Sequence, residues 1–177
     1  MIETPRLRLR PWRDADRTAF AAMLADPPVM RDLGGPVDRA AADAKLDRYV
    51  ATLARAGIAR LVVTGHDGRF LGYAGVMPLD PGHPASAAFD VGWRLVRGAW
   101  GRGFATEAAR ATLHDAFGRL GLAEVVAFTA PHNLRSQAVM QRLGMRRDPD
   151  RDYTAAWGGG DWRGLVWTAR PDPAPGA

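Results

Sequence analysis

The chain contains no cysteine. Disulfide bonds, zinc sites built on thiolates and a cysteine nucleophile are therefore excluded from its chemistry. Chains without disulfides are typical of a reducing compartment, so we expect a cytoplasmic protein. The four histidines, at positions 66, 83, 114 and 132, include no pair spaced for a shared metal ion on one helix face, and no metal site is predicted.

Long apolar runs are also missing. No segment approaches the ~20 apolar residues of a membrane-spanning helix. The opening residues, MIETPRLRLRPWR, are too charged for a signal peptide. The length of 177 residues suits one domain with its own core. We expect this domain over residues 1–170, followed by a disordered, proline-rich tail over residues 171–177.

Lysine is almost absent, because Lys45 is the only one, and arginine supplies nearly all the positive charge behind a net charge of +5. The arginines are scattered among aspartates along the chain, and no basic run interleaves with aromatic residues. Nucleic acid is therefore not predicted as the main partner. The positive excess favours a polyanionic small ligand instead.

Hydrophobic periodicity predicts the order of strands and helices. Strands are expected over residues 6–12, 61–63, 70–77, 87–96, 124–130, 145–153 and 165–170, and helices over residues 14–24, 38–56, 103–120 and 133–143. Residues 27–36 are expected to form a loop. This order predicts an α/β fold of the α+β type with a mixed sheet. The strand–helix–strand unit between positions 89 and 129 predicts two parallel neighbouring strands.

The turn RGAWGRGFA precedes the third predicted helix. Gly98, Gly101 and Gly103 leave the main chain open to close approach by a ligand. The first N–H groups of a helix have no internal acceptor and carry the positive end of its dipole. With Arg97 and Arg102, this turn is suited to bind phosphate. The alternative is that the glycines only permit a tight turn; the nucleoside-triphosphate and dinucleotide fingerprints are both absent.

The stretch HNLRS begins the fourth predicted helix. Asn133 is the only asparagine of the chain, and Ser136 is one of two serines. Asn133 is expected either to cap the helix or to bind a ligand. Ser136 lies on the apolar stripe of the helix, where a hydroxyl without a partner costs about 1–3 kcal/mol. Both helices begin beyond the carboxyl ends of adjacent parallel strands, where open α/β sheets bind ligands.

Three ordered motifs together resemble the GCN5-related N-acetyltransferase (GNAT) superfamily and, within it, the RimJ/RimL-type branch. They are TPRLRLRPWRDAD with DPPVMRDLGG, FDVGWRLVRGAWGRGFATEAARATLHDAFGRLGL, and APHNLRSQAVMQRLGM. The resemblance runs from about position 4 to 170. It implies a mixed, mostly antiparallel sheet of about seven strands with about four helices. It also implies a splayed parallel strand pair at the cofactor site.

The resemblance implies acetyl-CoA as the acetyl donor and a role for each matched residue. The cofactor is expected to contact Leu95, Val96, Arg97, Trp100, Gly101, Arg102, Gly103, Phe104, Ala105, Thr106, Asn133 and Ser136. Its diphosphate is expected on the main chain at residues 100–104 and its pantetheine arm along Leu95 and Val96. Ser136 is implied near the sulfur, and Asp90 matches an acidic position that serves as base or binds the substrate amine. Gly98 departs from the Gln or Arg that is frequent at its position.

The expected reaction is direct attack of a neutral primary amine on the thioester, since no cysteine is present and neither serine lies in a G-x-S-x-G motif. The amine is expected to be the α-amino group of a protein or peptide, or a small-molecule amine. The alternatives are a non-catalytic CoA-binding protein and an RNA- or ribosome-associated protein. No membrane partner is expected, and both a monomer and a homodimer remain open.

Overall fold

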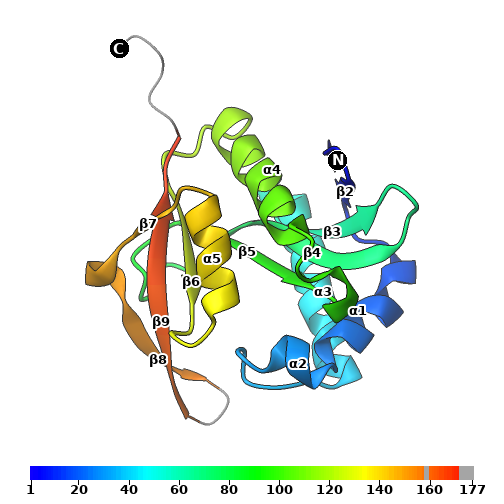
Figure 1. Ribbon diagram of the computed structural model, residues 1–177, viewed down its shortest axis with the longest axis horizontal. Helices are drawn as coiled ribbons and strands as arrows, with labels where there is room; N and C mark the ends of the chain where they lie inside the picture. The colour runs from blue at the N-terminus through cyan, green and yellow to red at the C-terminus, as the bar shows by residue number, and fades with distance from the viewer. Residues whose placement is uncertain (158–159, 172–177) are drawn as a thin grey trace.

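The computed structural model describes residues 1–157 and 160–171, and its helices and strands surround one extended sheet (Figure 1). The strands are β1 (Ile2–Glu3), β2 (Leu7–Arg10), β3 (Arg60–Gly65), β4 (Phe70–Pro78), β5 (Phe89–Leu95), β6 (Val125–Thr129), β7 (Arg146–Arg147), β8 (Tyr153–Trp157) and β9 (Gly160–Ala169). The α-helices are α1 (Arg17–Leu24), α2 (Pro27–Met30), α3 (Arg39–Ala56), α4 (Phe104–Gly118) and α5 (Leu134–Arg142).

The sheet has nine strands in the order β1-β2-β3-β4-β5-β6-β9-β7, and β8 pairs with β9. All neighbours are antiparallel except β5 and β6, so the predicted mixed, mostly antiparallel fold with one parallel pair is confirmed. The parallel pair shares one registered position, Asp90 opposite Val126. Beyond it the two strands diverge toward their carboxyl ends, and α4 and α5 begin beside this divergence.

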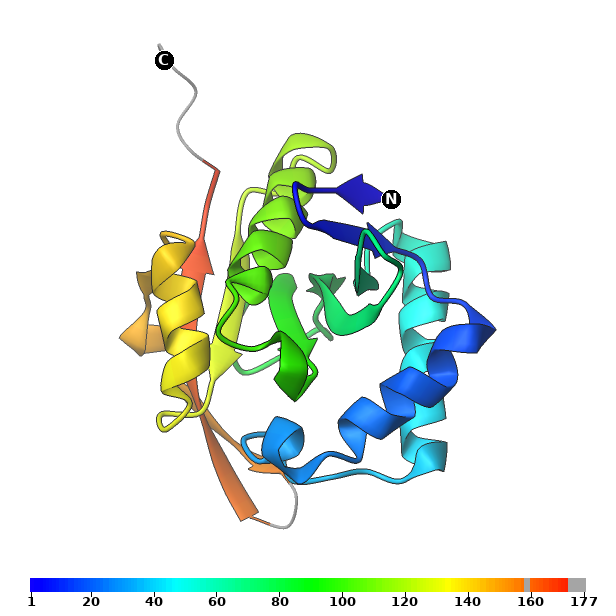
Figure 2. The ribbon, with the colours of Figure 1, turned by 45° about the vertical axis from the view of Figure 1, so that its right-hand side comes forward.

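The helices cover both faces of the sheet. On one face, α4 and α5 pack over Val76, Val91 and Val125. On the other, α1, α2 and α3 pack over Val62 and Tyr73. Because side chains alternate along a strand, successive residues of β4 and β5 face different helices. Figure 2 shows α4 lying alongside the N-terminal strands.

Helix boundaries follow local signals. The side chain of Asp38 caps α3 by accepting a hydrogen bond from the N–H of Ala41 at 2.8 Å. Gly57 ends the same helix in the left-handed region, with φ of +67°. The first long helix begins at Arg17, because Asp14–Asp16 forms a 3-10 turn ahead of it.

The sequence prediction does not include β1 or residues 160–164 of β9, and it differs from the structure in two further parts of the chain. Residues 27–36 are not entirely loop, since they begin with the short helix α2, whose first turn tolerates proline. Residues 145–153 do not form one strand: β7 has two residues, a 3-10 turn follows at Pro149–Arg151, and β8 begins at Tyr153. Most of the expected disordered tail, residues 172–177, lies outside the described residues.

Candidate functional site

The turn into α4 presents free backbone N–H groups. Gly101 and Gly103 have φ of +73° and +78°, which residues with a Cβ rarely adopt. Within the described residues, the N–H groups of residues 101–106 donate to no protein acceptor, and the first helical hydrogen bond runs from Glu107 N to Gly103 O. A row of unpaired donors at a helix N-terminus is an anion-binding site.

The N-terminal segment supports this turn from behind, which the sequence analysis missed. Glu107 Oε1 accepts hydrogen bonds from Thr4 Oγ1 at 2.6 Å and from Arg6 N at 3.0 Å. Arg6 Nη2 forms an ion pair with Glu107 Oε2 at 2.6 Å, and its Nη1 donates to the carbonyl of Arg102 at 2.9 Å. Burial would raise the pKa of Glu107, but the hydrogen bonds from Thr4 and Arg6 outweigh it and lower that pKa. The carboxylate therefore stays charged and fixes the turn.

Asn133 and Ser136 form a hydrogen-bonded pair at the start of α5. Asn133 is the N-cap, and its Oδ1 accepts from the N–H of Ser136 at 3.1 Å. Its Nδ2 donates to Ser136 Oγ at 3.2 Å. The cap and the side-chain pairing coexist, so the hydroxyl oxygen of Ser136 is held as an acceptor while its hydrogen stays available for another partner.

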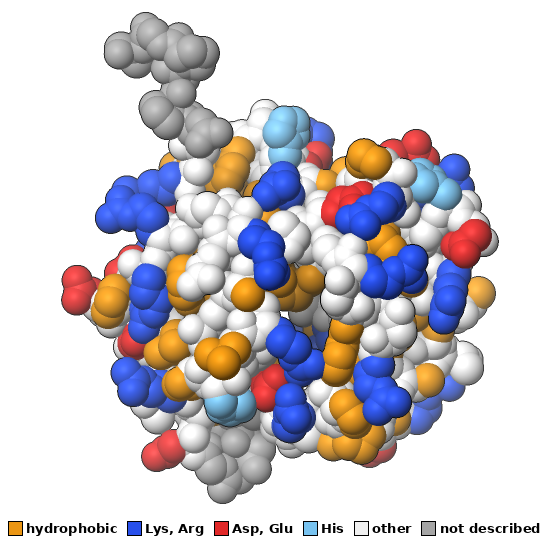
Figure 3. Space-filling model, in the orientation of Figure 1, with side chains coloured by type: hydrophobic (Ala, Val, Ile, Leu, Met, Phe, Trp, Pro, Cys, Tyr) orange, Lys and Arg blue, Asp and Glu red, His pale blue; other side chains and the backbone are white. Residues whose placement is uncertain are grey.

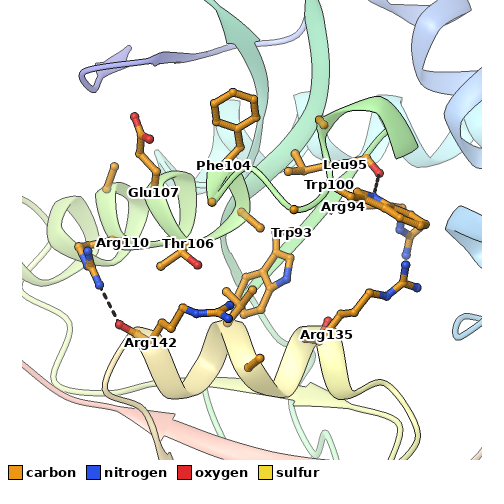
Figure 4. Close-up of a pocket in the computed structure, with 18 of the residues that line it drawn as sticks. Trp93, Arg94, Leu95, Trp100, Phe104, Thr106, Glu107, Arg110, Arg135 and Arg142 are labelled. Atoms are coloured by element: carbon orange, nitrogen blue, oxygen red, sulfur yellow. Dashed lines mark hydrogen bonds between the residues drawn. The ribbon is translucent and has the colours of Figure 1, made fainter.

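These features meet in one cleft of about 1580 Å³ between α4 and α5. The predicted residues on its walls are Leu95, Trp100, Gly101, Gly103, Phe104, Ala105, Thr106, Asn133 and Ser136. Figure 4 shows the ring of Trp93 in the middle of the cleft, between the two helices. The remaining predicted residues, Asp90, Val96, Arg97 and Arg102, do not line it.

Backbone groups expected to bind the pantetheine arm are partly engaged within the protein. The carbonyl of Leu95 accepts a hydrogen bond from Trp100 Nε1 at 2.8 Å. The N–H of Val96 donates to Leu71 O at 3.0 Å, and its carbonyl accepts from Ala99 N at 2.9 Å. The pantetheine role of these groups stays a prediction.

Asp90 lies away from the cleft, in a buried ion pair. Its Oδ2 contacts Arg60 Nη2 at 2.5 Å, and both residues are less than one tenth exposed. Arg60 Nη1 also donates to the carbonyls of Asp90 and Gly75. Asp90 faces the same side of β5 as Gly92, as the strand alternation predicts. Its role as base stays a prediction, and the ion pair favours a structural role.

The residues at the other end of the cleft are not among the predicted site residues. Asp32, in the segment after α2, contacts His132 Nε2 at 3.1 Å and Arg135 Nη2 at 3.5 Å. The guanidinium of Arg135 lies 4.1 Å from the ring centroid of Trp100. Arg94 lines the cleft beside them. No local motif marks these residues, because their contacts join segments far apart in the sequence.

The surface around the cleft is rich in cationic side chains. Figure 3 shows Lys and Arg side chains on both sides of the hollow that separates the two halves of this face. Residues 1–157 and 160–171 contain no group of three or more His, Asp or Glu side chains placed to hold a metal ion. Over the same residues, no helix has the length and apolar character needed to cross a bilayer. The cleft thus combines unpaired N–H donors with cationic walls.

Known proteins are similar to this chain in sequence or in structure. The chain is 29% identical to the uncharacterized protein YkkB of Bacillus subtilis (strain 168) over 146 residues, which are 81% of this chain and 84% of YkkB. An acetyltransferase of Agrobacterium tumefaciens str. C58 is 31% identical, with a TM-score of 0.81 over 96% of this chain and 94% of that chain.

A structure of RimL, a ribosomal L7/L12 alpha-N-protein acetyltransferase in complex with coenzyme A, has a TM-score of 0.77 over 94% of this chain and 95% of that chain. At 13% identity this likeness shows the fold alone, so the RimJ/RimL branch stays a prediction. The family described as Acetyltransferase (GNAT) domain matches residues 6–146, which are most of the chain. With this match, the splayed strand pair and the glycine turn into α4, the chain belongs to the GNAT family of acetyltransferases.

Proposed function

We propose that this protein is an N-acetyltransferase that transfers the acetyl group of acetyl-CoA to a primary amine, either an α-amino group of a peptide or protein or a small-molecule amine. One observation carries the proposal. Residues 101 and 103–106, whose N–H groups are free, line the same cleft as the Asn133–Ser136 pair. An anion-binding turn and a positioned hydroxyl in one cleft suit a ligand that has a diphosphate and a reactive sulfur.

The residues of the turn fit the diphosphate of CoA. Gly101 has open space where a Cβ would stand, and Gly103 would place a Cβ 3.3 Å from Arg6 Nη2. The main chain can therefore come close to phosphate oxygens and donate several N–H groups to them. The row continues into the first turn of α4, so the helix dipole adds to the attraction.

Ser136 is proposed to act at the sulfur. Acetyl-CoA supplies the thioester carbonyl that the amine attacks directly. Ser136 Oγ accepts from Asn133 Nδ2, and this orients its O–H hydrogen away from Asn133. Ser136 can donate this proton to the sulfur of CoA as the thiolate leaves. Proton transfer of this kind typically contributes 10²- to 10⁴-fold to a rate.

The free energy needed to deprotonate the amine favours some acceptors over others. A lysine amine with a pKa of about 10.4 requires roughly 4–5 kcal/mol to lose its proton at pH 7. An α-amine with a pKa near 8 requires only about 1.4 kcal/mol. Because Asp90 is bound to Arg60 and lies outside the cleft, the site lacks a strong base there. We therefore favour an α-amino group over a lysine side chain.

The test measures binding and turnover separately. Calorimetry with CoA should show binding that Gly103→Val weakens. Release of free CoA thiol from acetyl-CoA should rise when a suitable amine is added. Binding without transfer to any amine, peptide or antibiotic in a broad panel would instead support a non-catalytic CoA-binding protein. Salt-dependent RNA binding with a steep log–log slope, in the absence of CoA binding, would support the RNA-associated alternative.

A further inference from the structure

Arg94 is a cation in the cleft without an anion. It projects from β5 on the face opposite Trp93. Its Nη1 donates to the sulfur of Met30 at 3.0 Å, and its guanidinium carbon lies 5.6 Å from the ring centroid of Tyr73. Its Nε is buried and has no hydrogen-bond partner. Within the described part of the chain, no carboxylate oxygen lies within 4.0 Å of a guanidinium nitrogen of Arg94, so this residue forms no ion pair there.

The surroundings of Arg94 are positive overall. Figure 4 shows the head groups of Arg94 and Arg135 pointing toward one another beside Trp100. Arg135 pairs with Asp32, and that carboxylate also contacts His132 and Arg31. Two converging guanidinium groups with one shared carboxylate repel each other unless another anion binds between them.

A second set of charges lies behind Arg94. Burial would raise the pKa of Tyr73, but the positive charges of Arg94, Lys45 and Arg60 and a hydrogen bond with Tyr49 together lower it. The carboxylate on this side, Asp90, is already paired with Arg60. The described residues therefore place no carboxylate against Arg94, and its partly exposed guanidinium is free to bind the negative charge of a ligand.

The position of Arg94 separates its ligand from the CoA diphosphate. The free N–H groups of residues 101–106 belong to the α4 side of the sheet, where Trp93 also packs. Arg94 extends toward α2 and the helices of the opposite face. Arg94 nevertheless lines the cleft. The part of the cleft beside it, lined by Val29 and Asp32, is left for the acceptor once CoA lies against α4.

We propose that the acceptor amine carries a carboxylate and that Arg94 binds this carboxylate. The inference rests on the proposed acetyl transfer and names the substrate class for it. A guanidinium binds a carboxylate through two parallel N–H···O bonds, which fixes direction as well as charge. The carboxylate can belong to a free α-amino acid or to an acidic residue near the N-terminus of a peptide, and the experiment separates these sources.

The same positive charge has a chemical consequence for the amine. Nearby cations disfavour the protonated form, so an ammonium group brought beside Arg94 and Arg135 loses its proton more readily than in water. The carboxylate compensates the charge of the site while the nitrogen faces the thioester. A site of this kind reduces the need for a strong general base.

The experiment compares matched acceptors on matched variants. Each free amino acid is compared with its amide, and each C-terminally amidated dipeptide with Glu at its second position is compared with the counterpart that has Gln there. The variants are Arg94→Gln, Arg94→Lys and the control Arg55→Gln. Arg55 is exposed, makes no hydrogen bond or ion pair with described residues and carries the same charge. The measurements are kcat/KM from thiol release and calorimetric binding of each acceptor to the protein–CoA complex.

The wild type and Arg55→Gln should prefer the carboxylate member of at least one pair. Arg94→Gln should lower kcat/KM and affinity for that member by about 10- to 100-fold and leave its neutral counterpart nearly unchanged. Arg94→Lys should retain part of the preference for the carboxylate member. If Arg94→Gln is insoluble, the reduced preference of Arg94→Lys relative to the wild type is the result that tests the proposal. Preference confined to free amino acids, or to acidic peptides, identifies the source of the carboxylate.

Three results would overturn the inference. The first is a panel in which no carboxylate-bearing amine accelerates thiol release. The second is a preference that survives in Arg94→Gln. The third is a loss of CoA affinity in Arg94→Gln without a change in acceptor preference, because the guanidinium would then bind the cofactor. A protein that binds no CoA at all would instead contradict the proposed acetyl transfer, so the two failures are distinguishable.

Discussion

Asp90→Asn should destabilise the fold before it affects the chemistry. The substitution removes the negative charge that faces Arg60 Nη2 at 2.5 Å and leaves that guanidinium buried without a counter-ion. Arg60 cannot move out of its site easily, because it also donates to the carbonyls of Gly75 and Asp90 and packs against Gly92. Breaking one partner of a buried ion pair costs about 3–5 kcal/mol of unfolding free energy.

The magnitude converts into a measurable thermal shift. For a chain of this size, each 1 kcal/mol corresponds to about 2–4 °C in Tm, so Asp90→Asn should lower Tm by roughly 6–20 °C. The double variant Arg60→Met/Asp90→Leu removes both charges together. It should recover at least half of the loss, since replacing a buried pair with apolar side chains is often neutral or stabilising. Differential scanning calorimetry of the three proteins at pH 7 measures these shifts.

The same variants decide whether Asp90 is a base. If Asp90→Asn keeps a Tm within about 2 °C of the wild type but loses turnover and the acidic limb of its pH–rate profile, the structural interpretation is wrong and Asp90 acts on the substrate. If turnover per folded molecule stays close to that of the wild type at a temperature well below both midpoints, the base role is excluded.

Four further predictions concern the residues that line the cleft. Gly103→Val should reduce CoA affinity about tenfold in calorimetry, because a β-branched residue at φ of +78° is strained by about 1–3 kcal/mol; Gly57→Val, strained in the same way but distant from the cleft, should leave CoA affinity unchanged. Ser136→Ala should lower kcat by about 10²-fold with little change in KM for acetyl-CoA. Asn133→Ser keeps a capping hydroxyl but removes the Nδ2 donor, so it should lower kcat while Tm stays within a few degrees of the wild type. If Ser136→Ala and Asn133→Ser both keep the wild-type kcat, the pair serves only to cap the helix. The pKa of Glu107 is lowered from its ordinary value of 4.5, so the stability it provides is present above that value and is lost as the pH falls through the folded pKa. Acid unfolding below about pH 5 should therefore be steeper in the wild type than in Glu107→Gln.

Much of the fold follows from signals within a few residues of one another. Asp38 and Gly57 mark both ends of α3, and the alternation around Asp90 assigns each residue of β5 to a face. The same local reasoning is wrong for residues 27–36 and 145–153. A four-residue helix gives too short a periodic pattern, and the boundary between β7 and β8 depends on pairing with β9. Strand pairing over a long sequence separation leaves no local mark.

The candidate site divides along the same line. The glycine turn and the Asn133–Ser136 pair are local, so their spacing predicts that both lie at helix N-termini. The partner of Asp90 could not be predicted, because Arg60 lies on a different strand and the sequence does not state which cation a buried carboxylate meets. For the same reason, strand alternation puts Arg94 on the face of Asp90 but does not predict that it lies in the cleft near Arg135 (Figure 4).

These contacts together suggest how such a site works without an assigned base. If Asp90 only stabilises the sheet, three other contributions have to accelerate acetyl transfer. They are positioning of the amine, protonation of the departing sulfur and a lowered pKa of the amine. Ser136, oriented by Asn133, provides the second contribution, and the nearby cations Arg94 and Arg135 provide the third (Figure 4). The pH–rate profile tests this division. With a carboxylate-bearing acceptor, the wild type should reach half of its maximal rate at a lower pH than Arg94→Gln, because removing the cation raises the pKa of the bound amine. An unchanged midpoint in Arg94→Gln would mean that the proton is taken by another group and that the charge of the cleft has no part in the chemistry.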